Sequence, residues 1–246
     1  MDIPFEPNIF GVKVNIHLIL EYAAFFVGFR YYVYLRKRST DHISSNNRLS
    51  IIIGAVFGAF LGSRIFGFLE NPVLSTGAEY LLSILSAKTI MGGLFGGLLG
   101  VEIAKKIIGE KASSGDLFTF PIILGIIIGR IGCFLAGINE FTYGKETFSF
   151  LGMDLGDGIM RHPVALYEVV FLILLWLFLK RFQNIAKAES GLLFKYFMTA
   201  YFLFRFCIEF LKPNIFLILG LSSIQYLCIL CMIYYWKTIL KLFHAR

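Results

Sequence analysis

The chain has 246 residues, of which 57% are apolar and only 16% are charged, and its mean hydropathy is +0.75. Soluble domains average about 45–50% apolar and about 25% charged residues. This composition excludes a disordered chain, a secreted disulfide scaffold and an ordinary cytosolic enzyme. The net charge of +7 is typical of a membrane protein with basic cytoplasmic loops, so no nucleic-acid partner is expected.

Long apolar segments set the expected fold. A membrane-spanning helix needs about 20 mostly apolar residues. We expect seven such helices, at 15–35, 49–68, 89–108, 117–137, 163–183, 192–211 and 217–238. The sequence therefore predicts an all-α polytopic membrane protein in which residues 1–246 form one integral membrane domain. Segment 80–86 is too short to span and is expected to be a re-entrant or interfacial helix, and residues 138–162 form the longest non-helical stretch.

Basic residues predict the orientation. Most lysines and arginines outside the spans fall in the loops after the first, third and fifth spans and at the C-terminus. The positive-inside rule then places the N-terminus outside and the C-terminus in the cytoplasm. The N-terminus lacks the basic region of a cleaved signal peptide, so none is expected.

Small residues and cysteines complete the general features. Gly54, Gly58 and Gly62 recur at intervals of four, a spacing that lets helix backbones approach closely. All the cysteines lie in apolar segments, without the spacing or histidine partners of a metal site, so we expect buried thiols, no metal and no cofactor. They are Cys133, Cys207, Cys228 and Cys231.

Arginines inside the spans are the unusual feature. An arginine at the centre of a membrane helix costs about 2.5–3.5 kcal/mol on insertion scales. Arg30 lies near the cytoplasmic end of its span and is expected to be an interfacial anchor. Arg64, Arg130 and Arg205 lie deeper and have two interpretations, internal ion pairs or an anion-binding site. The acids available for pairing within the spans are Glu21, Glu102, Glu168 and Glu209.

The surroundings of Arg130 favour the anion-binding interpretation. Gly129 and Gly132 flank it and leave room for a ligand beside the backbone. A guanidinium is always charged and presents a planar fork of donors that matches phosphate oxygens. We therefore expect a lipid phosphate at this position.

Two further clusters carry polar side chains at the same predicted depth. Tyr201, Arg205 and Glu209 are spaced by four residues and share one helix face. His162 precedes a proline at the outer start of the fifth span, where it either caps the helix or acts as a general acid or base. Glu168 follows deeper in that helix, where it can orient an arginine or accept a proton.

These motifs together resemble the prolipoprotein diacylglyceryl transferase family. The resemblance rests on Gly129-Arg-Ile-Gly-Cys-Phe-Leu-Ala-Gly followed by Tyr143-Gly144, on Arg161-His-Pro-x-x-Leu-Tyr-Glu168, and on Tyr201-x-x-Phe-Arg-Phe-x-x-Glu209. Further motifs in the family's order are Met91-Gly-Gly-Leu, Gly62-Ser-Arg64 and Gln225, and the resemblance covers about residues 15–240.

The resemblance implies a bacterial cytoplasmic (inner) membrane enzyme that transfers diacylglyceryl from phosphatidylglycerol to the lipobox cysteine of a prolipoprotein. The products are a thioether and glycerol phosphate. Arg130 and Arg205 match arginines expected to hold the lipid head group, and Tyr201 matches an active-site tyrosine. Arg64 and Glu209 match polar positions of the site, with Gly129 and Gly132 beside Arg130.

The chain also departs from the family pattern. Met91 or Phe95 stands where many members carry a histidine, a candidate base, and Cys133 stands where many carry asparagine. His162, Glu168 and Tyr201 are the substitute candidates for the base. The alternatives are an anion- or lipid-binding membrane transporter, a non-catalytic paralogue, and an enzyme with a different acceptor.

Overall fold

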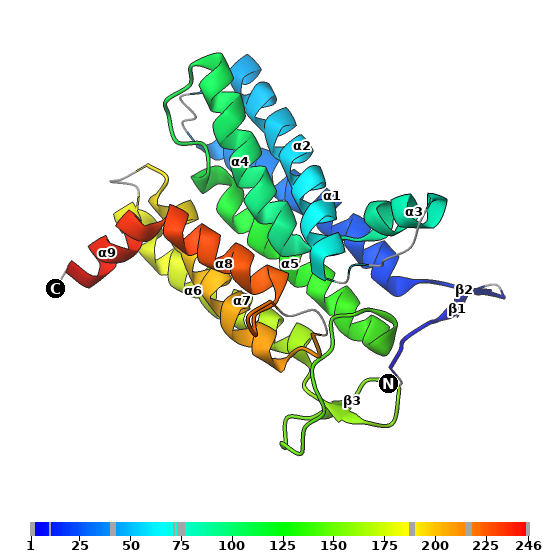
Figure 1. The fold of residues 1–246 in the computed structure, drawn as a ribbon. Helices are drawn as coiled ribbons and strands as arrows, with labels where there is room; N and C mark the ends of the chain where they lie inside the picture. The colour runs from blue at the N-terminus through cyan, green and yellow to red at the C-terminus, as the bar shows by residue number, and fades with distance from the viewer. Residues whose placement is uncertain are drawn as a thin grey trace. The chain divides into compact units, whose positions relative to one another are not determined.

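The described part of the chain is mostly helical (Figure 1). The structure is a computed structural model that describes residues 3–9, 11–39, 43–70, 72, 77–186, 190–214 and 218–244. Two compact units alternate along the sequence. The first contains residues 1–40, 115–197 and 210–213, and the second contains residues 41–114, 198–209 and 214–246. The single membrane domain expected from the sequence stays a prediction.

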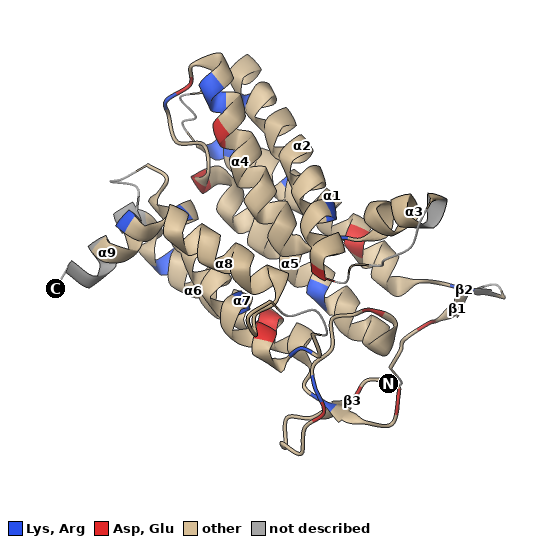
Figure 2. Cartoon of the chain, viewed as in Figure 1, with Lys and Arg blue, Asp and Glu red and all other residues tan. Residues whose placement is uncertain are grey.

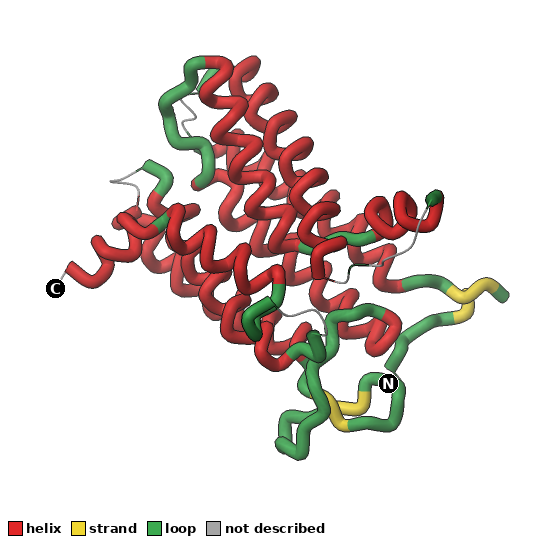
Figure 3. The backbone as a smooth tube through the Cα atoms, in the orientation of Figure 1, coloured by secondary structure: helices red, strands yellow, loops and turns green. Residues whose placement is uncertain are grey.

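The first unit is built on α1 and α5, which pack together in Figure 1. Its elements in order are β1 (Asn8–Ile9), β2 (Val12–Lys13), α1 (Ile16–Arg38), α5 (Asp116–Ala136), η1 (Gly137–Asn139), β3 (Met153–Asp154), β4 (Met160–Arg161) and α6 (Val164–Ala186). The start of α7 (Leu192–Ile208) also belongs to it. β1 pairs with β2, and β3 with β4, as short antiparallel hairpins seen in yellow in Figure 3.

Side-chain caps explain where two of these helices begin. The side chain of Asn15 accepts a hydrogen bond of 3.0 Å from the backbone N–H of Leu18 at the start of α1. Asp116 accepts from the backbone N–H groups of Gly191 (2.6 Å) and Phe194 (3.0 Å) at the start of α7. The first N–H groups of a helix have no partner within it, so these carboxylate and amide oxygens fix both helix starts.

The second unit is built on α2 (Ser45–Glu70) and α4 (Ile90–Ile108), which lie side by side in Figure 1. Its remaining elements are α3 (Ala78–Ser86), the rest of α7, α8 (Ser223–Tyr234) and α9 (Trp236–His244). The turn η2 (Glu209–Leu211) crosses the division between the two units. In Figure 2 the middle of α4 is tan, and its charged residues gather toward its C-terminal end, where Lys105 and Lys106 lie.

Helix length and composition support part of the expected membrane topology. Three helical segments of the described chain, Ile16–Arg38, Ser45–Glu70 and Asp116–Asn139, are long and apolar enough to cross a membrane. A fourth candidate is the pair Tyr80–Ser86 and Ile90–Ile108, whose axes are bent by 80° as in a broken span or a re-entrant loop. Large apolar side chains such as Phe25 of α1 are exposed on these helices, which fits a lipid-facing surface.

The other expected spans agree with the structure to different degrees. α6 (Val164–Ala186) occupies the span expected at 163–183, and α7 with the turn η2 covers the span expected at 192–211. The span expected at 217–238 contains α8, a 12-residue helix shorter than the roughly 20 residues that a span requires, and α9 follows it. Among the cysteines, Cys133, Cys228 and Cys231 are buried as expected, whereas the expectation for Cys207 was wrong because its side chain is exposed.

Glycines hold α2 and α4 in close contact, as the spacing of Gly54, Gly58 and Gly62 predicts. A methyl group added at Gly96 of α4 would collide with the carbonyl oxygen of Gly58 and approach the Cα atom of Gly62 to 2.9 Å. The same group added at Gly97 would meet its nearest atoms only at 3.5 Å, an ordinary contact. The two neighbouring glycines therefore differ sharply in the room around them.

We expect Gly96→Ala to lower the melting temperature of the detergent-solubilised protein, and Gly97→Ala to change it little. Overpacking of this kind costs about 1–3 kcal/mol because the helix backbones must separate. Thermal unfolding monitored by circular dichroism measures both variants. Equal melting temperatures would show that the contact between α2 and α4 is not tight.

Candidate functional site

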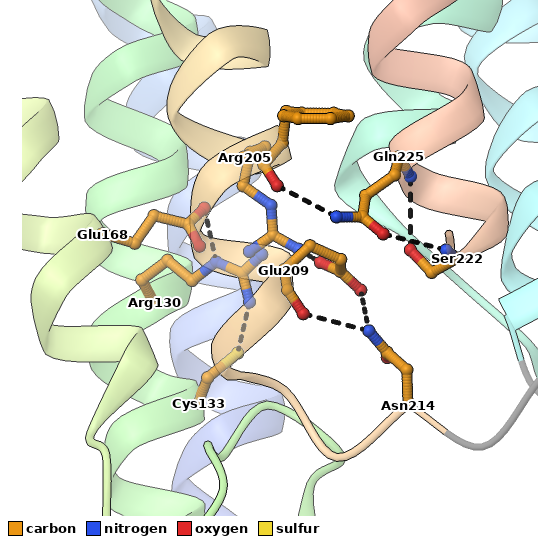
Figure 4. A network of polar contacts seen from close by, with 9 residues as sticks. Arg130, Cys133, Glu168, Arg205, Glu209, Asn214, Ser222 and Gln225 are labelled. Atoms are coloured by element: carbon orange, nitrogen blue, oxygen red, sulfur yellow. Dashed lines mark hydrogen bonds and ion pairs between the residues drawn. The ribbon is translucent and has the colours of Figure 1, made fainter. Parts of the chain in front are cut away.

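A buried ion pair joins α5 to α6 in the first unit (Figure 4). The Nε atom of Arg130 lies 2.8 Å from Oε1 of Glu168. Both side chains are buried, and Glu168 is fully enclosed. Nη1 of Arg130 also donates to the Sγ atom of Cys133, one turn along α5, at 3.9 Å. The carboxylate of Glu168 therefore fixes the direction of the Arg130 guanidinium.

The structure adds two residues that the sequence analysis missed, His17 and Glu140. His17 Nδ1 lies 3.0 Å from Oε1 of Glu140, and His17 Nε2 lies 3.6 Å from Sγ of Cys133. His17 lies at the start of α1 and Glu140 directly follows η1. The one available signal was that both are polar residues near the expected outer ends of apolar segments, where Cys133 also lies. Their distance along the sequence hides the contact.

A second buried ion pair lies in the other unit, within one stretch of chain. Nη2 of Arg205 donates to Oε2 of Glu209 at 3.0 Å, and the side-chain amide of Asn214 donates to Oε1 of Glu209 at 3.1 Å. Figure 4 shows Arg205 and Asn214 on either side of the Glu209 carboxylate. The shared face predicted for Arg205 and Glu209 is confirmed. Tyr201, one turn earlier, is fully buried.

Gln225, which the sequence motifs singled out, supports this part of the chain. Its Nε2 atom donates to the backbone carbonyl of Phe206 at 3.3 Å. Its Oε1 atom accepts from the backbone N–H of Ser222, and its own N–H donates to the Ser222 hydroxyl. This reciprocal arrangement is a capping box at the start of α8. Gln225 therefore links the start of α8 to the helix that carries Arg205.

The remaining site candidates, Arg64, Gly129 and Gly132, each have different neighbours. Arg64 is half-buried and donates from Nη1 to the carbonyl oxygen of Ala87 at 2.9 Å, so this hydrogen bond goes to the backbone. A Cβ atom built at Gly129 would meet nothing within 4 Å, so the backbone there is accessible. A Cβ atom at Gly132 would come within 3.3 Å of the His17 ring, so α1 takes up the room beside this glycine.

In the described part of the chain, no hydrogen bond joins His162 to Arg130. Its Nδ1 atom lies 3.1 Å from the hydroxyl of Tyr167, and its backbone carbonyl accepts from Gly144 at 2.9 Å. A Cβ atom at Gly144 would come within 2.6 Å of the His162 Cβ, so the Tyr143-Gly144 segment packs directly against it. The loop is thereby pinned to the start of α6.

Arg161, the neighbour of His162, is held by an acid in the hairpin loop. Its Nη2 atom lies 2.7 Å from Oδ2 of Asp157, and its guanidinium lies 5.2 Å from the ring centroid of Tyr143. The hydrogen bond from Arg161 lowers the pKa of the Asp157 carboxyl. The same contact raises the pKa of Arg161. This pair stabilises the loop that leads into α6.

The ion pairs bear on both interpretations of the buried arginines. Arg130 and Arg205 each contact a carboxylate, as the internal-tie interpretation predicts. A carboxylate also fixes the orientation of a guanidinium, which an anion-binding site requires. The same contacts therefore neutralise the buried guanidinium groups and hold them in fixed directions.

We expect Glu168→Leu to destabilise the protein strongly and the double variant Arg130→Met/Glu168→Leu to recover most of the loss. Removing one partner of a buried pair costs about 3–5 kcal/mol because it leaves an uncompensated charge, whereas replacing both is often neutral. Thermal unfolding of both variants measures the effect. An unchanged melting temperature in Glu168→Leu would contradict the buried pairing.

Comparison with known proteins shows that the chain is similar to one enzyme family. The family described as prolipoprotein diacylglyceryl transferase matches residues 6–240. A phosphatidylglycerol–prolipoprotein diacylglyceryl transferase of Nitratidesulfovibrio vulgaris is 33% identical over 180 residues, which are 66% of this chain and 61% of the relative. A protein of the same name from Rickettsia akari is 35% identical over 179 residues (65% of each chain).

A third relative with this name, from Finegoldia magna, is 28% identical over 220 residues, which are 84% of this chain and 82% of the relative. The matched segment therefore spans less than two thirds of the first two relatives and about four fifths of the third. The family match extends over almost the whole sequence and includes α1, α5, α6 and α7 with their buried polar residues. The chain belongs to the prolipoprotein diacylglyceryl transferase family.

Proposed function

We propose that the protein transfers diacylglyceryl from phosphatidylglycerol to the thiol of a lipobox cysteine in a prolipoprotein. The sulfur of the acceptor attacks the glyceryl carbon, a thioether forms, and glycerol phosphate leaves. The family match and the names of the relatives support this reaction. The apolar helices support a membrane location, where both the lipid and the acceptor's signal-peptide region are available.

We extend the proposal to the topology. The chain forms one integral domain with seven spans in the bacterial inner membrane, its N-terminus outside and its C-terminus in the cytoplasm. The long apolar helices α1, α2 and α5 support spanning, and the basic residues Arg36, Lys37 and Arg38 in the last turn of α1 fit a cytoplasmic helix end. The bent pair α3 and α4 fits one of the remaining spans.

The observation that carries the proposed chemistry is the buried Arg130 guanidinium, oriented by Glu168 at 2.8 Å. Negative charge grows on the phosphate as glycerol phosphate leaves. A fixed cationic donor in a dry site stabilises that charge without reorganising during the reaction. Arg205, oriented by Glu209 at 3.0 Å, supplies a second guanidinium of the same kind. We assign both arginines to the lipid phosphate and Glu168 to orienting Arg130.

The remaining site residues have supporting roles in this proposal. Glu209 positions Arg205 for the substrate, and Tyr201 lies one turn away on the same helix face. The open backbone at Gly129 provides room for a lipid head group, and Gly132 lets α1 approach α5. In addition, Arg64 contributes positive charge to substrate binding, and His162 is the candidate base for the acceptor thiol.

One observation favours a second candidate function, an anion- or lipid-binding transporter. The axes of α3 and α4 are bent by 80°, and broken helices are common at the binding sites of transporters. The same buried arginines would then hold an anion during transport. Anion-dependent flux in liposomes, without diacylglyceryl transfer to any lipoprotein peptide, would favour this candidate.

We expect Arg130→Lys to lose most of the transfer activity while the protein keeps its fold. Lysine preserves the charge but has no planar fork for two phosphate oxygens, so the bidentate contact is lost. The assay follows the transfer from phosphatidylglycerol vesicles to a fluorescent lipobox peptide, and a melting curve checks the fold. Arg30→Lys, an exposed arginine of α1, is the matched control and should remain active.

Full activity in Arg130→Lys would show that a point charge is sufficient at this position. Transfer that survives the double variant Arg130→Ala/Arg205→Ala would contradict the assignment of both arginines to the phosphate.

We expect His162→Ala to lower the transfer rate and to change its dependence on pH. An imidazole can accept the thiol proton as a general base, and alanine cannot. The pH dependence of the rate constant in wild type and variant measures this effect. Tyr167→Phe is the control, because it removes the hydroxyl beside His162 but keeps the imidazole. An unchanged profile in His162→Ala would exclude His162 as the base.

A further inference from the structure

Three side chains from separate segments form a connected thiol, imidazole and carboxylate in the first unit. Cys133 Sγ lies 3.6 Å from Nε2 of His17, and Nδ1 of His17 lies 3.0 Å from Oε1 of Glu140. Cys133 and His17 are each 8% exposed, while the Glu140 side chain is 34% exposed. The sulfur is therefore shielded, and the outer end of the array reaches solvent.

The other buried cysteines provide an internal comparison. Cys228 and Cys231 are fully buried in α8, and no histidine contacts them in the described part of the chain. Cys133 is buried to a similar degree but has an imidazole on one side and the Arg130 guanidinium at 3.9 Å on the other. Burial alone therefore does not account for the polar partners of Cys133.

The arrangement matches the requirements of nucleophilic catalysis. A thiol becomes a strong nucleophile when a neighbouring base takes its proton and nearby positive charge favours the thiolate. The base in turn needs a third group that fixes its tautomer and orientation. His17 fills the first role and Glu140 the second, while Arg130 supplies the positive charge. The three groups do not form a metal-binding cluster in the described chain.

We propose that Cys133, His17 and Glu140 form a second catalytic centre, in which Cys133 accepts an acyl group from a lipid carboxylic ester. The substrate class follows from the position of the centre between α1 and α5, which are long apolar helices fit for a membrane. An apolar acyl chain is the substrate that such surroundings accept. This activity uses a different nucleophile from the diacylglyceryl transfer proposed above, and Arg130 contributes to both.

The proposed reaction has two steps, acylation of Cys133 and release of the acyl group. His17 takes the thiol proton, and the Cys133 sulfur attacks the ester carbonyl carbon. The bond between that carbon and the ester oxygen breaks, the leaving alkoxide takes the proton from His17, and the acyl group remains on sulfur as a thioester. Water or an amine then attacks the thioester, and Cys133 regains its proton through His17.

The imidazole indicates an ester rather than the glyceryl carbon as the target. An alkoxide is a poor leaving group and needs a proton from a positioned acid, which an imidazolium at this distance from sulfur provides. A phosphate leaves as a stable anion and needs only cationic stabilisation. Attack of Cys133 on the glyceryl carbon would also end in a stable thioether that cannot turn over.

The test is single-turnover acylation of the full chain by p-nitrophenyl palmitate in detergent micelles. Cys207→Ser serves as the background, because it removes the exposed thiol. We expect a nitrophenolate burst of about one per chain, a palmitoyl group that maps to Cys133, and its release by neutral hydroxylamine. His17→Gln should slow the burst by about 100-fold or more, as is typical for loss of a general base.

Matched variants separate this centre from general thiol chemistry. Cys228→Ala and Cys231→Ala should keep the full burst, Cys133→Ala should lose it, and Glu140→Gln should reduce it. The acylation is overturned by an adduct on any other residue, by an adduct that resists hydroxylamine, or by a burst that is unchanged in His17→Gln.

A second measurement keeps the proposal falsifiable where a variant fails to fold. Alkylation of the Cys207→Ser protein by N-ethylmaleimide, followed by peptide mapping, should label Cys133 faster than Cys228 and Cys231. We expect a difference of at least about tenfold, because an imidazole lies beside Cys133, whereas no described histidine lies beside Cys228 or Cys231. Equal or slower labelling of Cys133 overturns the proposal. Vesicles of phosphatidylcholine and phosphatidylglycerol that carry palmitoyl chains should also yield palmitoylated Cys133. Absence of acylation from these vesicles would overturn the assignment of a lipid ester as the substrate.

Discussion

The buried contact between Arg130 and Glu168 is the constraint on which the site depends. A guanidinium in an apolar helix costs about 2.5–3.5 kcal/mol on insertion scales, and an unpaired buried charge is more costly still. Glu168 offsets this penalty and, at 2.8 Å, fixes the direction of the guanidinium. The same contact joins α5 to α6, so the fold and the proposed phosphate site rest on one interaction.

The packing of the neighbouring helices determines which other polar side chains lie near this ion pair. Gly132 lets α1 approach α5, and the close approach brings His17 beside Cys133. One turn separates Cys133 from Arg130, so the first unit holds a cationic group and a thiol with its own base near the same end of α5. In the other unit, Glu209 orients Arg205 in the way that Glu168 orients Arg130, although its partner lies on the same stretch of chain.

Local features of the fold were predictable from the sequence, and contacts between distant segments were not. Apolar length located α1, α2, α4 and α5 within a few residues, and the spacing of four predicted the contact between Arg205 and Glu209. The sequence offered several acids in the spans as partners for Arg130. The packing of α5 against α6 determines that the partner is Glu168. The array of His17, Cys133 and Glu140 was missed because it joins three segments whose packing no local pattern encodes. Within the final expected span, 217–238, the structure has a break between α8 and α9 that hydropathy does not register.

The central claim is that Arg130 is held at the end of an apolar helix to bind a lipid phosphate. A structure of the protein determined in nanodiscs that contain phosphatidylglycerol tests it most directly. The account predicts a head-group phosphate oxygen within about 3 Å of an Arg130 guanidinium nitrogen, the usual length of a charge-assisted hydrogen bond. A head group bound elsewhere, with Arg130 enclosed by Glu168 and protein atoms alone, would contradict it.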